Sequence, residues 1–339
     1  MHMGYIKYFQ GVPLSVLDLA PITEGSNATQ SFKNSVQLAQ LTEGLGFHRY
    51  WLAEHHNMPG IASSATSVLI GHIAGATKQI RVGAGGIMLP NHATLVIAEQ
   101  FGTLESLYPG RIDLGLGRAP GSDQATAYAL RRTLQSGAEE FPMQVEELED
   151  YFSGSPYARV RAIPGEGLTI PIWLLGSSGF SARLAAQKGL PFSFASHFSP
   201  DYTLPALQIY RENFQPSEAL DKPYAMLGVN IIAAETDEQA QLLSTSQQQQ
   251  FLSLSRNEPT QLKPPIENME DIWSPLERAH IEKTLDSRST IVGSPETVQR
   301  KLKVFIDETK ADEIIINSQI FDQTARLRSY EIIAGMMDE

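Results

Sequence analysis

The chain has 339 residues, of which 42% are hydrophobic, none is cysteine, and the formal net charge is −12. Its length suffices for two ordinary domains or for one α/β barrel with insertions. The lack of cysteine excludes disulfide bonds, thiolate metal ligands and thiol nucleophiles. The negative charge argues against nucleic acid as the main partner. No stretch approaches the ~18 apolar residues of a membrane span and the start lacks a secretion signal, so we expect a soluble, cytoplasmic protein.

Strand and helix patterns alternate along the chain. Eight apolar segments predict strands, namely Leu14–Leu19, Tyr50–Ala53, Ile80–Met88, Ile112–Leu116, Ile172–Leu175, Phe192–Ala195, Met226–Ala233 and Glu313–Asn317. Several are continuous apolar runs, as in parallel strands covered on both faces. The segments between them carry helical periodicity, as at Leu38, Leu41 and Leu45, and Ser294 followed by Pro295 predicts a helix start. Eight strands with helical crossovers favour a (β/α)₈ TIM barrel, with an open doubly wound sheet as the alternative.

Two segments interrupt the repeat. Residues 119–170 are rich in proline and glycine, and residues 244–292 are polar. We expect both to be insertions after barrel strands, where lids and binding loops lie, within a single domain that spans residues 1–339. The run Gln247–Gln250 is short enough to be a plain solvated helix turn.

The strand at Tyr50–Ala53 ends in Glu54, His55 and His56. A pair of histidines bonded to backbone, a metal site and a single proton-transferring histidine are all open readings. Adjacent residues on a strand point to opposite faces, so His55 and His56 do not easily share one ion, and the other histidines show no ligand spacing. We therefore expect no metal, and a histidine titrating near neutral pH fits better.

Two glycine-containing segments follow. Gly83-Ala84-Gly85-Gly86 lies in a strand, where glycine marks either close approach of a flat ligand or a crowded barrel interior. Further on, a strand runs into a helix through Gly176, Ser177, Ser178 and Gly179, with Ser181 in the first helical turn. Free amides, hydroxyls and the positive helix end predict a phosphate site, with a serine-capped helix as the alternative. Arg118, at an earlier strand end, supplies a cationic partner.

Taken in order, these motifs resemble the bacterial luciferase-like flavin monooxygenase family. The family has a strand ending in Glu-His-His, an Arg-Val-Gly…Leu-Pro strand, an Ala-Glu…Leu-x-x-Leu helix and a Gly-Arg…Gly-x-Gly/Cys-Arg strand. The corresponding segments here are Glu54–His56, Arg81–Pro90, Ala98–Leu107 and Gly110–Arg118. Gly176–Gly179 and Ala186–Pro191 match the phosphate-binding turn and the entry to the next strand. The match runs from Leu14 to about Pro191, with a final strand at Asp312–Ser318.

The resemblance implies that FMN, or its reduced form, binds at the carboxyl-end mouth of the barrel. Gly85 and Gly86 would form the bulged segment, often with a non-proline cis peptide, against which the isoalloxazine ring packs. His55 and Glu54 would be catalytic. The phosphate would be held by Arg118, Gly176, Ser177, Ser178, Gly179 and Ser181.

The implied reaction uses reduced FMN and O₂, through a C4a-peroxyflavin, to oxygenate a small organic substrate. NAD(P)H would be the indirect reductant, either on this protein or through a separate flavin reductase, and relatives are often homodimers. Water would be excluded by Trp51, Met88 and Leu89 and by a mobile lid from residues 244–292. Gly117 replaces a reactive cysteine of the luciferase α chain, so the resemblance does not extend to light emission or a long-chain aldehyde. A deazaflavin-dependent hydride transfer and a non-catalytic flavin-binding protein are the alternative functions.

Overall fold

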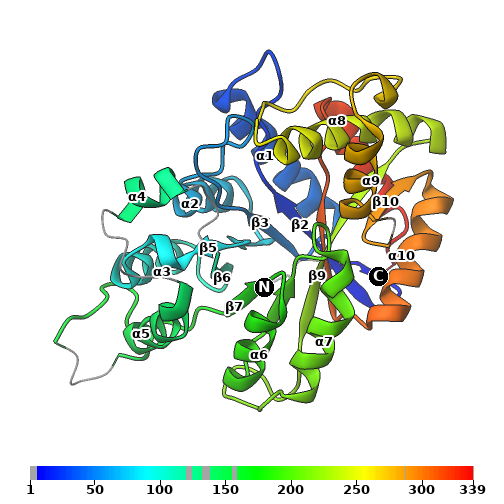
Figure 1. Cartoon of the computed structure of the whole chain (residues 1–339). Helices are drawn as coiled ribbons and strands as arrows, with labels where there is room; N and C mark the ends of the chain where they lie inside the picture. The colour runs from blue at the N-terminus through cyan, green and yellow to red at the C-terminus, as the bar shows by residue number, and fades with distance from the viewer. Residues whose placement is uncertain (1–5, 120–123, 132–137, 155–158, 287, 339) are drawn as a thin grey trace.

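The structure is a computed structural model that describes residues 6–119, 124–131, 138–154, 159–286 and 288–338. Its central strands are β2 (Val12–Asp18), β3 (Arg49–Leu52), β4 (Arg81–Ala84), β6 (Ile112–Gly117), β7 (Ile172–Gly176), β8 (Phe192–Phe194), β9 (Ala225–Ala233) and β11 (Glu313–Asn317). They are parallel, and β2 pairs with β11 on one side and β3 on the other, which closes the sheet (Figure 1). The predicted (β/α)₈ barrel is confirmed, and the open sheet is wrong.

Each predicted strand coincides with a barrel strand apart from shifts at its ends. The segment predicted at Ile80–Met88 divides, because β4 ends at Ala84 and a short strand β5 (Ile87–Met88) follows the Gly85–Gly86 peptide bond, which is cis. Both β4 and β5 pair with β6. Gly85 and Gly86 therefore lie between two paired segments at the carboxyl end of a barrel strand.

Helices surround the barrel on its outside (Figure 1). They are α1 (Ala28–Leu45), α2 (Thr66–Ala76), α3 (Thr94–Leu107), α5 (Phe141–Ser153), α6 (Gly179–Lys188), α7 (Thr203–Glu212), α10 (Pro295–Thr309) and α11 (Gln323–Ala334). The predicted helix start is confirmed, since Ser294 is the N-cap of α10 and its hydroxyl accepts a hydrogen bond from the amide of Thr297. The apolar faces of these helices and the outward side chains of the strands form the main hydrophobic core.

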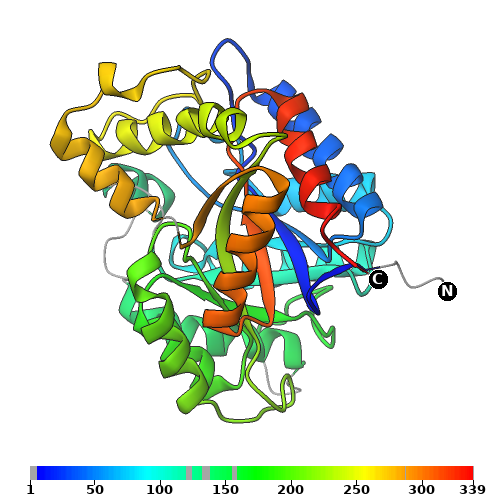
Figure 2. The same cartoon turned by 90° about the vertical axis from the view of Figure 1, so that its right-hand side faces the viewer.

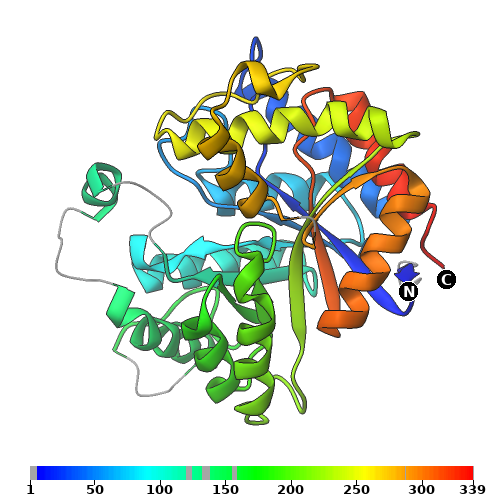
Figure 3. The same cartoon turned by 45° about the vertical axis from the view of Figure 1, so that its right-hand side comes forward.

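The remaining elements lie outside the eight barrel strands and the helices that surround them. They are β1 (Tyr8–Phe9), β10 (Thr290–Gly293), α4 (Gln124–Arg131), α8 (Asp237–Ser255), α9 (Pro275–Thr284) and the 3₁₀ turns η1 (Leu89–Asn91), η2 (Ala138–Glu140), η3 (Pro200–Tyr202) and η4 (Met269–Asp271). Strand β10 extends the sheet by pairing with β9. Helices α8 and α9, yellow and gold, lie over one end of the barrel in Figures 2 and 3. Among the described residues, no helix has the length and apolarity needed to cross a bilayer.

The barrel interior is layered. Near the amino ends of the strands, the guanidinium of Arg49 lies 2.7 Å from an oxygen of Asp113 and 3.1 Å from one of Glu313. All three side chains are buried or nearly so, and each charge has an opposite partner, as buried charges require. The layer above is apolar and consists of Leu17, Ala53, Trp51, Trp173, Met226 and Ile315.

Trp51 fits into this interior because β4 carries glycine opposite it. A Cβ atom on Gly83 would lie 2.7 Å from Cβ of Asp113 and 2.8 Å from the indole nitrogen of Trp51. The indole nitrogen donates a 3.1 Å hydrogen bond to Asp113, and the ring packs edge-to-face on Trp173, 5.2 Å between centroids. Charged and aromatic layers thus form a solid floor beneath the carboxyl-end mouth.

Candidate functional site

A cavity of about 360 Å³ opens at the carboxyl ends of the strands. Its walls come from the ends of β2, β3, β4, β6, β7, β8, β9 and β11, and helix α8 contributes Gln250, Phe251 and Leu254. This is where parallel barrels place their ligands. Trp51 and Met88 line the cavity, as predicted, whereas Leu89 packs in the outer core and is not among the lining residues. The prediction for Leu89 is wrong because the chain turns into η1 immediately after Met88.

One corner of the cavity collects the residues predicted to hold a phosphate. Arg118, Gly176, Ser177, Ser178 and Ser181 all line it. Gly179 begins α6 beside them but is not among the lining residues. The N-cap of α6 is Ser178, and its side chain makes no capping hydrogen bond. The amides of the first helical turn therefore have no side-chain cap from that residue, which disfavours the simple serine-capped helix.

Arg118 brings positive charge to the same corner. Its guanidinium carbon lies 4.1 Å from the ring centroid of Phe180, in the first turn of α6. Within the described residues, Arg118 forms no ion pair with a carboxylate. A cation held on an aromatic face next to a helix N-terminus attracts an anion.

The glycine pair forms another edge of the cavity. Gly85 and Gly86 both line it. A Cβ on Gly85 would lie 2.8 Å from Leu17, and a Cβ on Gly86 would lie 2.7 Å from the carbonyl oxygen of Gly115. Crowding by neighbours thus accounts for the glycines, and their position at the cavity leaves the ligand-approach interpretation open as well. The cis peptide implied by the resemblance is present.

His55 lies on the cavity wall. Its ring is partly exposed, and within the described residues Nδ1 is buried without a hydrogen-bond partner. Burial lowers the pKa of His55 below its ordinary value, although the neighbouring Glu54 opposes this. The imidazole is therefore neutral at pH 7 and can accept or donate a hydrogen bond in the cavity.

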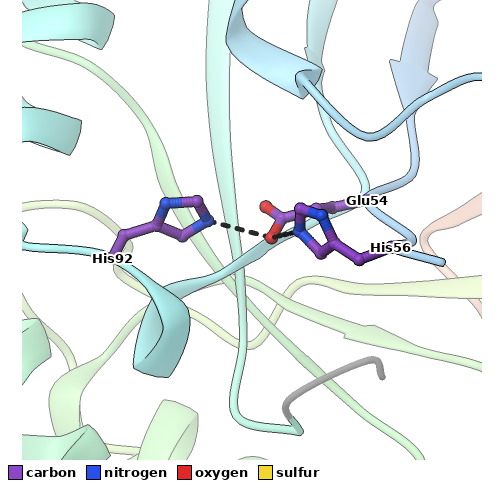
Figure 4. A group of neighbouring side chains, drawn as sticks. All are labelled: Glu54, His56 and His92. Atoms are coloured by element: carbon purple, nitrogen blue, oxygen red, sulfur yellow. Dashed lines mark hydrogen bonds and ion pairs between the residues drawn. The ribbon is translucent and has the colours of Figure 1, made fainter. Parts of the chain in front are cut away.

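Glu54 points elsewhere. Its carboxylate is buried but is not among the cavity-lining residues. One oxygen, Oε1, bonds to Nε2 of His56 at 2.8 Å and to Nε2 of His92 at 2.9 Å, as Figure 4 shows. The other, Oε2, accepts the amide of Met88 at 3.2 Å. Burial would raise the pKa of Glu54, but the hydrogen bonds from His92, His56 and Met88 outweigh it and hold that pKa below its ordinary value.

The structure adds cavity residues that the sequence did not indicate. His197 follows β8, and its Nδ1 lies against the backbone of β9, only 2.2 Å from where a Cβ on Gly228 would be. Burial lowers the pKa of His197 to about 4, with His55 contributing to the shift. Asn317 ends β11, and its amide nitrogen donates a 2.8 Å hydrogen bond to Asn230. No motif marks either residue, because each follows an ordinary strand.

Helix α8 contradicts one prediction directly. The glutamine run is not a solvated turn, since Gln247, Gln249 and Gln250 are buried beneath the helix. Gln249 donates a 2.8 Å hydrogen bond to the carbonyl of Pro264. Within the described residues, Oε1 of Gln250 is buried at the cavity without a partner. The glutamines face inward at the part of α8 that borders the cavity, where the neighbours are the cavity and a loop carbonyl.

Comparison with known proteins identifies the family. The family model for luciferase-like monooxygenases matches residues 12–313. The chain belongs to the luciferase-like monooxygenase family. YvbT, an uncharacterised protein of Bacillus subtilis (strain 168), is 64% identical to this luciferase-like monooxygenase over 325 residues, covering 95% of this chain and 96% of the relative. A luciferase-like monooxygenase of Escherichia coli (strain K12) is 56% identical over 329 residues, covering 97% and 98%.

A more distant relative has a named reaction. The N-acetyl-S-alkylcysteine monooxygenase of Bacillus subtilis (strain 168) is 32% identical over 336 residues, covering 95% of this chain and 97% of the relative. The family model and the names of these relatives identify the protein as an enzyme of the monooxygenase class.

Solved structures share the barrel. The crystal structure of apo-MsnO8 superposes with a TM-score of 0.87 at 34% identity, covering 96% of this chain and 98% of that one. The oxygenating constituent of 3,6-diketocamphane monooxygenase of Pseudomonas putida, in complex with FMN, gives 0.72 at 16% identity, covering 95% and 97%. An F420-dependent secondary alcohol dehydrogenase gives 0.67 at 12% identity, covering 96% and 99%. The last two similarities establish the fold alone.

Proposed function

We propose that this luciferase-like monooxygenase uses reduced FMN and dioxygen to oxygenate a small organic substrate in the mouth cavity. The observation that carries the proposal is the convergence, in one cavity, of a cationic phosphate corner at Arg118, a side-chain-free edge at Gly85 and Gly86, and the neutral imidazole of His55. An elongated molecule with an anionic end and a flat end matches that arrangement.

The residues present suit FMN in two respects. Arg118, Ser177, Ser178 and Ser181 would hold the phosphate, with the first-turn amides of α6. Gly85 and Gly86 would lie along the ring system. When bound in its reduced form, FMN supplies the electrons and activates dioxygen for transfer of one oxygen atom.

The protein itself would exclude water from the cavity and supply a group for proton transfer. Apolar side chains of Trp51, Met88, Phe251 and Leu254 line the cavity and would exclude water from the reacting atoms. His55 would hold or release a proton at the cavity wall. Because its carboxylate does not line the cavity, we assign Glu54 a positioning role: through the amide of Met88, it fixes the segment that carries Gly85 and Gly86.

The substrate class is proposed from a relative. The protein that is 32% identical is named for an N-acetyl-S-alkylcysteine, a small thioether that carries an amide and a carboxylate. The cavity presents an apolar wall and the amide oxygen of Gln250, which has no hydrogen-bond partner among the described residues and would accept an N–H group. N-acetyl-S-alkylcysteines are therefore the first substrates to assay.

Three partners complete the proposal. NAD(P)H would reduce the flavin through a separate reductase, in the cytoplasm, and two chains would associate as a homodimer. Oxygen uptake with and without an added flavin reductase tests the first point, and sedimentation equilibrium tests the last.

An absorption experiment tests the function. The protein is mixed with FMN, then reduced, and finally exposed to oxygen with the thioether. Binding of FMN with substrate-dependent reoxidation and a product heavier by one oxygen atom supports the proposal. Failure to bind FMN, with binding of a deazaflavin, would replace it by hydride transfer. Binding of FMN without turnover of any thioether would favour a non-catalytic flavin-binding protein.

A further inference from the structure

A cluster of side chains outside the cavity contains two histidines that have no part in the proposed monooxygenase reaction. Glu54, His56 and His92 come from the end of β3 and from the segment after η1. None of the three is among the cavity-lining residues. Their ligand atoms all lie within 4.8 Å of one another. Figure 4 shows both imidazoles directed toward the same carboxylate.

We propose that Glu54, His56 and His92 form a binding site for a divalent transition-metal ion of the zinc class. Two imidazole nitrogens and one carboxylate oxygen are a donor set that binds zinc and leaves a fourth position open. The carboxylate is buried, and the side chains of His56 and His92 are 14% and 26% exposed, so an ion has a route from solvent.

The distances suit such an ion after a small adjustment. Oε1 of Glu54 lies 2.8 Å from Nε2 of His56 and 2.9 Å from Nε2 of His92. Ligands of a tetrahedral zinc ion, each about 2.0–2.1 Å from the metal, are separated by about 3.3 Å. Each N–O distance must widen by about 0.5 Å, and the two imidazole nitrogens, which lie within 4.8 Å of each other, must approach by up to about 1.5 Å. Rotation of the histidine side chains about their torsions supplies these movements.

Protons must leave the ligand nitrogens when an ion binds. In the structure as described, each Nε2 faces a carboxylate oxygen and carries the hydrogen of that bond. Coordination requires each imidazole to carry its hydrogen on Nδ1, which a neutral ring achieves by changing tautomer. A ring that was protonated would release one proton to solvent.

The second carboxylate oxygen supplies the outer-shell support that metal sites need. Oε2 of Glu54 accepts the backbone amide of Met88, which lines the cavity. An ion on Oε1 would therefore be connected to the cavity edge through a single carboxylate. The expectation of no metal rested on the opposite faces of His55 and His56 and on the lack of ligand spacing among the other histidines. Spacing along the chain does not reveal His92 as a partner, because it lies on a segment that follows β5 and meets Glu54 and His56 only in the fold.

The test uses the full chain and zinc chloride as probe, in isothermal titration calorimetry, with cobalt chloride in parallel for its visible spectrum. We expect one ion per chain with a Kd of about 1 μM or tighter, and the strong visible absorption of four-coordinate cobalt. His56→Gln and His92→Gln each should weaken binding at least about tenfold. Glutamine keeps an N–H donor for Glu54, so these variants retain the hydrogen-bonded arrangement, and circular dichroism verifies that they fold.

His72→Ala and His280→Ala are the matched controls, because both side chains are exposed and lie outside the cluster. They should bind zinc as the parent does. A zinc concentration of about 100 μM is about a hundredfold above the expected Kd. Absence of binding at that concentration would overturn the proposal and leave the cluster as a structural hydrogen-bonded group. Binding that the two glutamine variants do not weaken would overturn it equally.

Discussion

The guanidinium carbon of Arg118 lies over the ring of Phe180, 4.1 Å from its centroid. The pair joins the end of β6 to the first turn of α6 and holds a positive charge at the corner of the cavity. An arginine that is already placed loses little freedom when it binds an anion, so the contact prepares the proposed phosphate site.

Replacing Arg118 by alanine should therefore weaken FMN binding. A hydrogen bond to a charged group is worth about 1.5–3 kcal/mol, which corresponds to a loss of roughly 10- to 150-fold in affinity. Fluorescence titration with FMN measures the change. Arg183→Ala is the control, because Arg183 is an exposed arginine on the same helix and does not line the cavity. An unchanged Kd in Arg118→Ala would remove this residue from the site.

His55→Ala should keep FMN binding and lose most of the turnover. The imidazole follows β3, whereas Arg118 and Ser177 follow β6 and β7, and β4 lies between, so its removal should leave the anion contacts intact. General acid–base catalysis contributes about 10²- to 10⁴-fold, and the rate of product formation should fall within that range. Turnover equal to that of the parent enzyme would show that His55 takes no part in the reaction.

Gln250→Met should raise the free energy of unfolding of the ligand-free protein and weaken binding of the substrate. Oε1 of Gln250 is buried without a partner among the described residues, and removing such an acceptor is worth about 1 kcal/mol in the free energy of unfolding. Urea denaturation measures this gain, and KM for the thioether should rise. Gln249→Met is the matched control and should destabilise, because Gln249 donates to the carbonyl of Pro264. A loss of stability in Gln250→Met would contradict the assignment.

The free energy of unfolding should fall as the pH drops from 7 to 5. The pKa of His197 is lowered to about 4 by burial, whereas an unfolded histidine titrates near 6.5, so the unfolded chain binds more protons between these values. Proton linkage then removes about 1–2 kcal/mol of stability over this range. His55, whose pKa is also lowered, acts in the same direction.

His197→Gln isolates the contribution of His197. Urea midpoints at pH 5 and pH 7 should lie closer together in the variant than in the parent, since glutamine does not titrate. Equal separation of the midpoints in both proteins would show that His197 is not held neutral by its surroundings.

Much of this architecture follows from local sequence. All eight barrel strands are visible as apolar runs, because parallel strands covered on both faces need no alternation. The ends of β3, β6 and β7 carry His55, Arg118 and Ser177, and barrel geometry alone brings these ends to one mouth.

The remainder depends on how distant segments meet. Glu54 neighbours His55 in the chain but faces away from the cavity, because successive side chains alternate. His92 joins it from the segment after β5. Gln250 is buried because α8 crosses the mouth of the barrel. The residue pattern of α8 does not predict that its polar face points inward. Single residues after strands, such as His197, have no motif to mark them.

The side chains of Arg49, Asp113 and Trp51 fill the barrel interior beneath the cavity, so the cavity opens toward the strand ends and α8. In the proposed reaction, the substrate, dioxygen and the oxidised product would pass between the strand ends and α8. Binding and release would then occur in sequence, and the molecule bound deepest in the cavity would be released last. The side chains of Phe251 and Leu254 at this threshold would set the pace of exchange as much as any group near the chemistry.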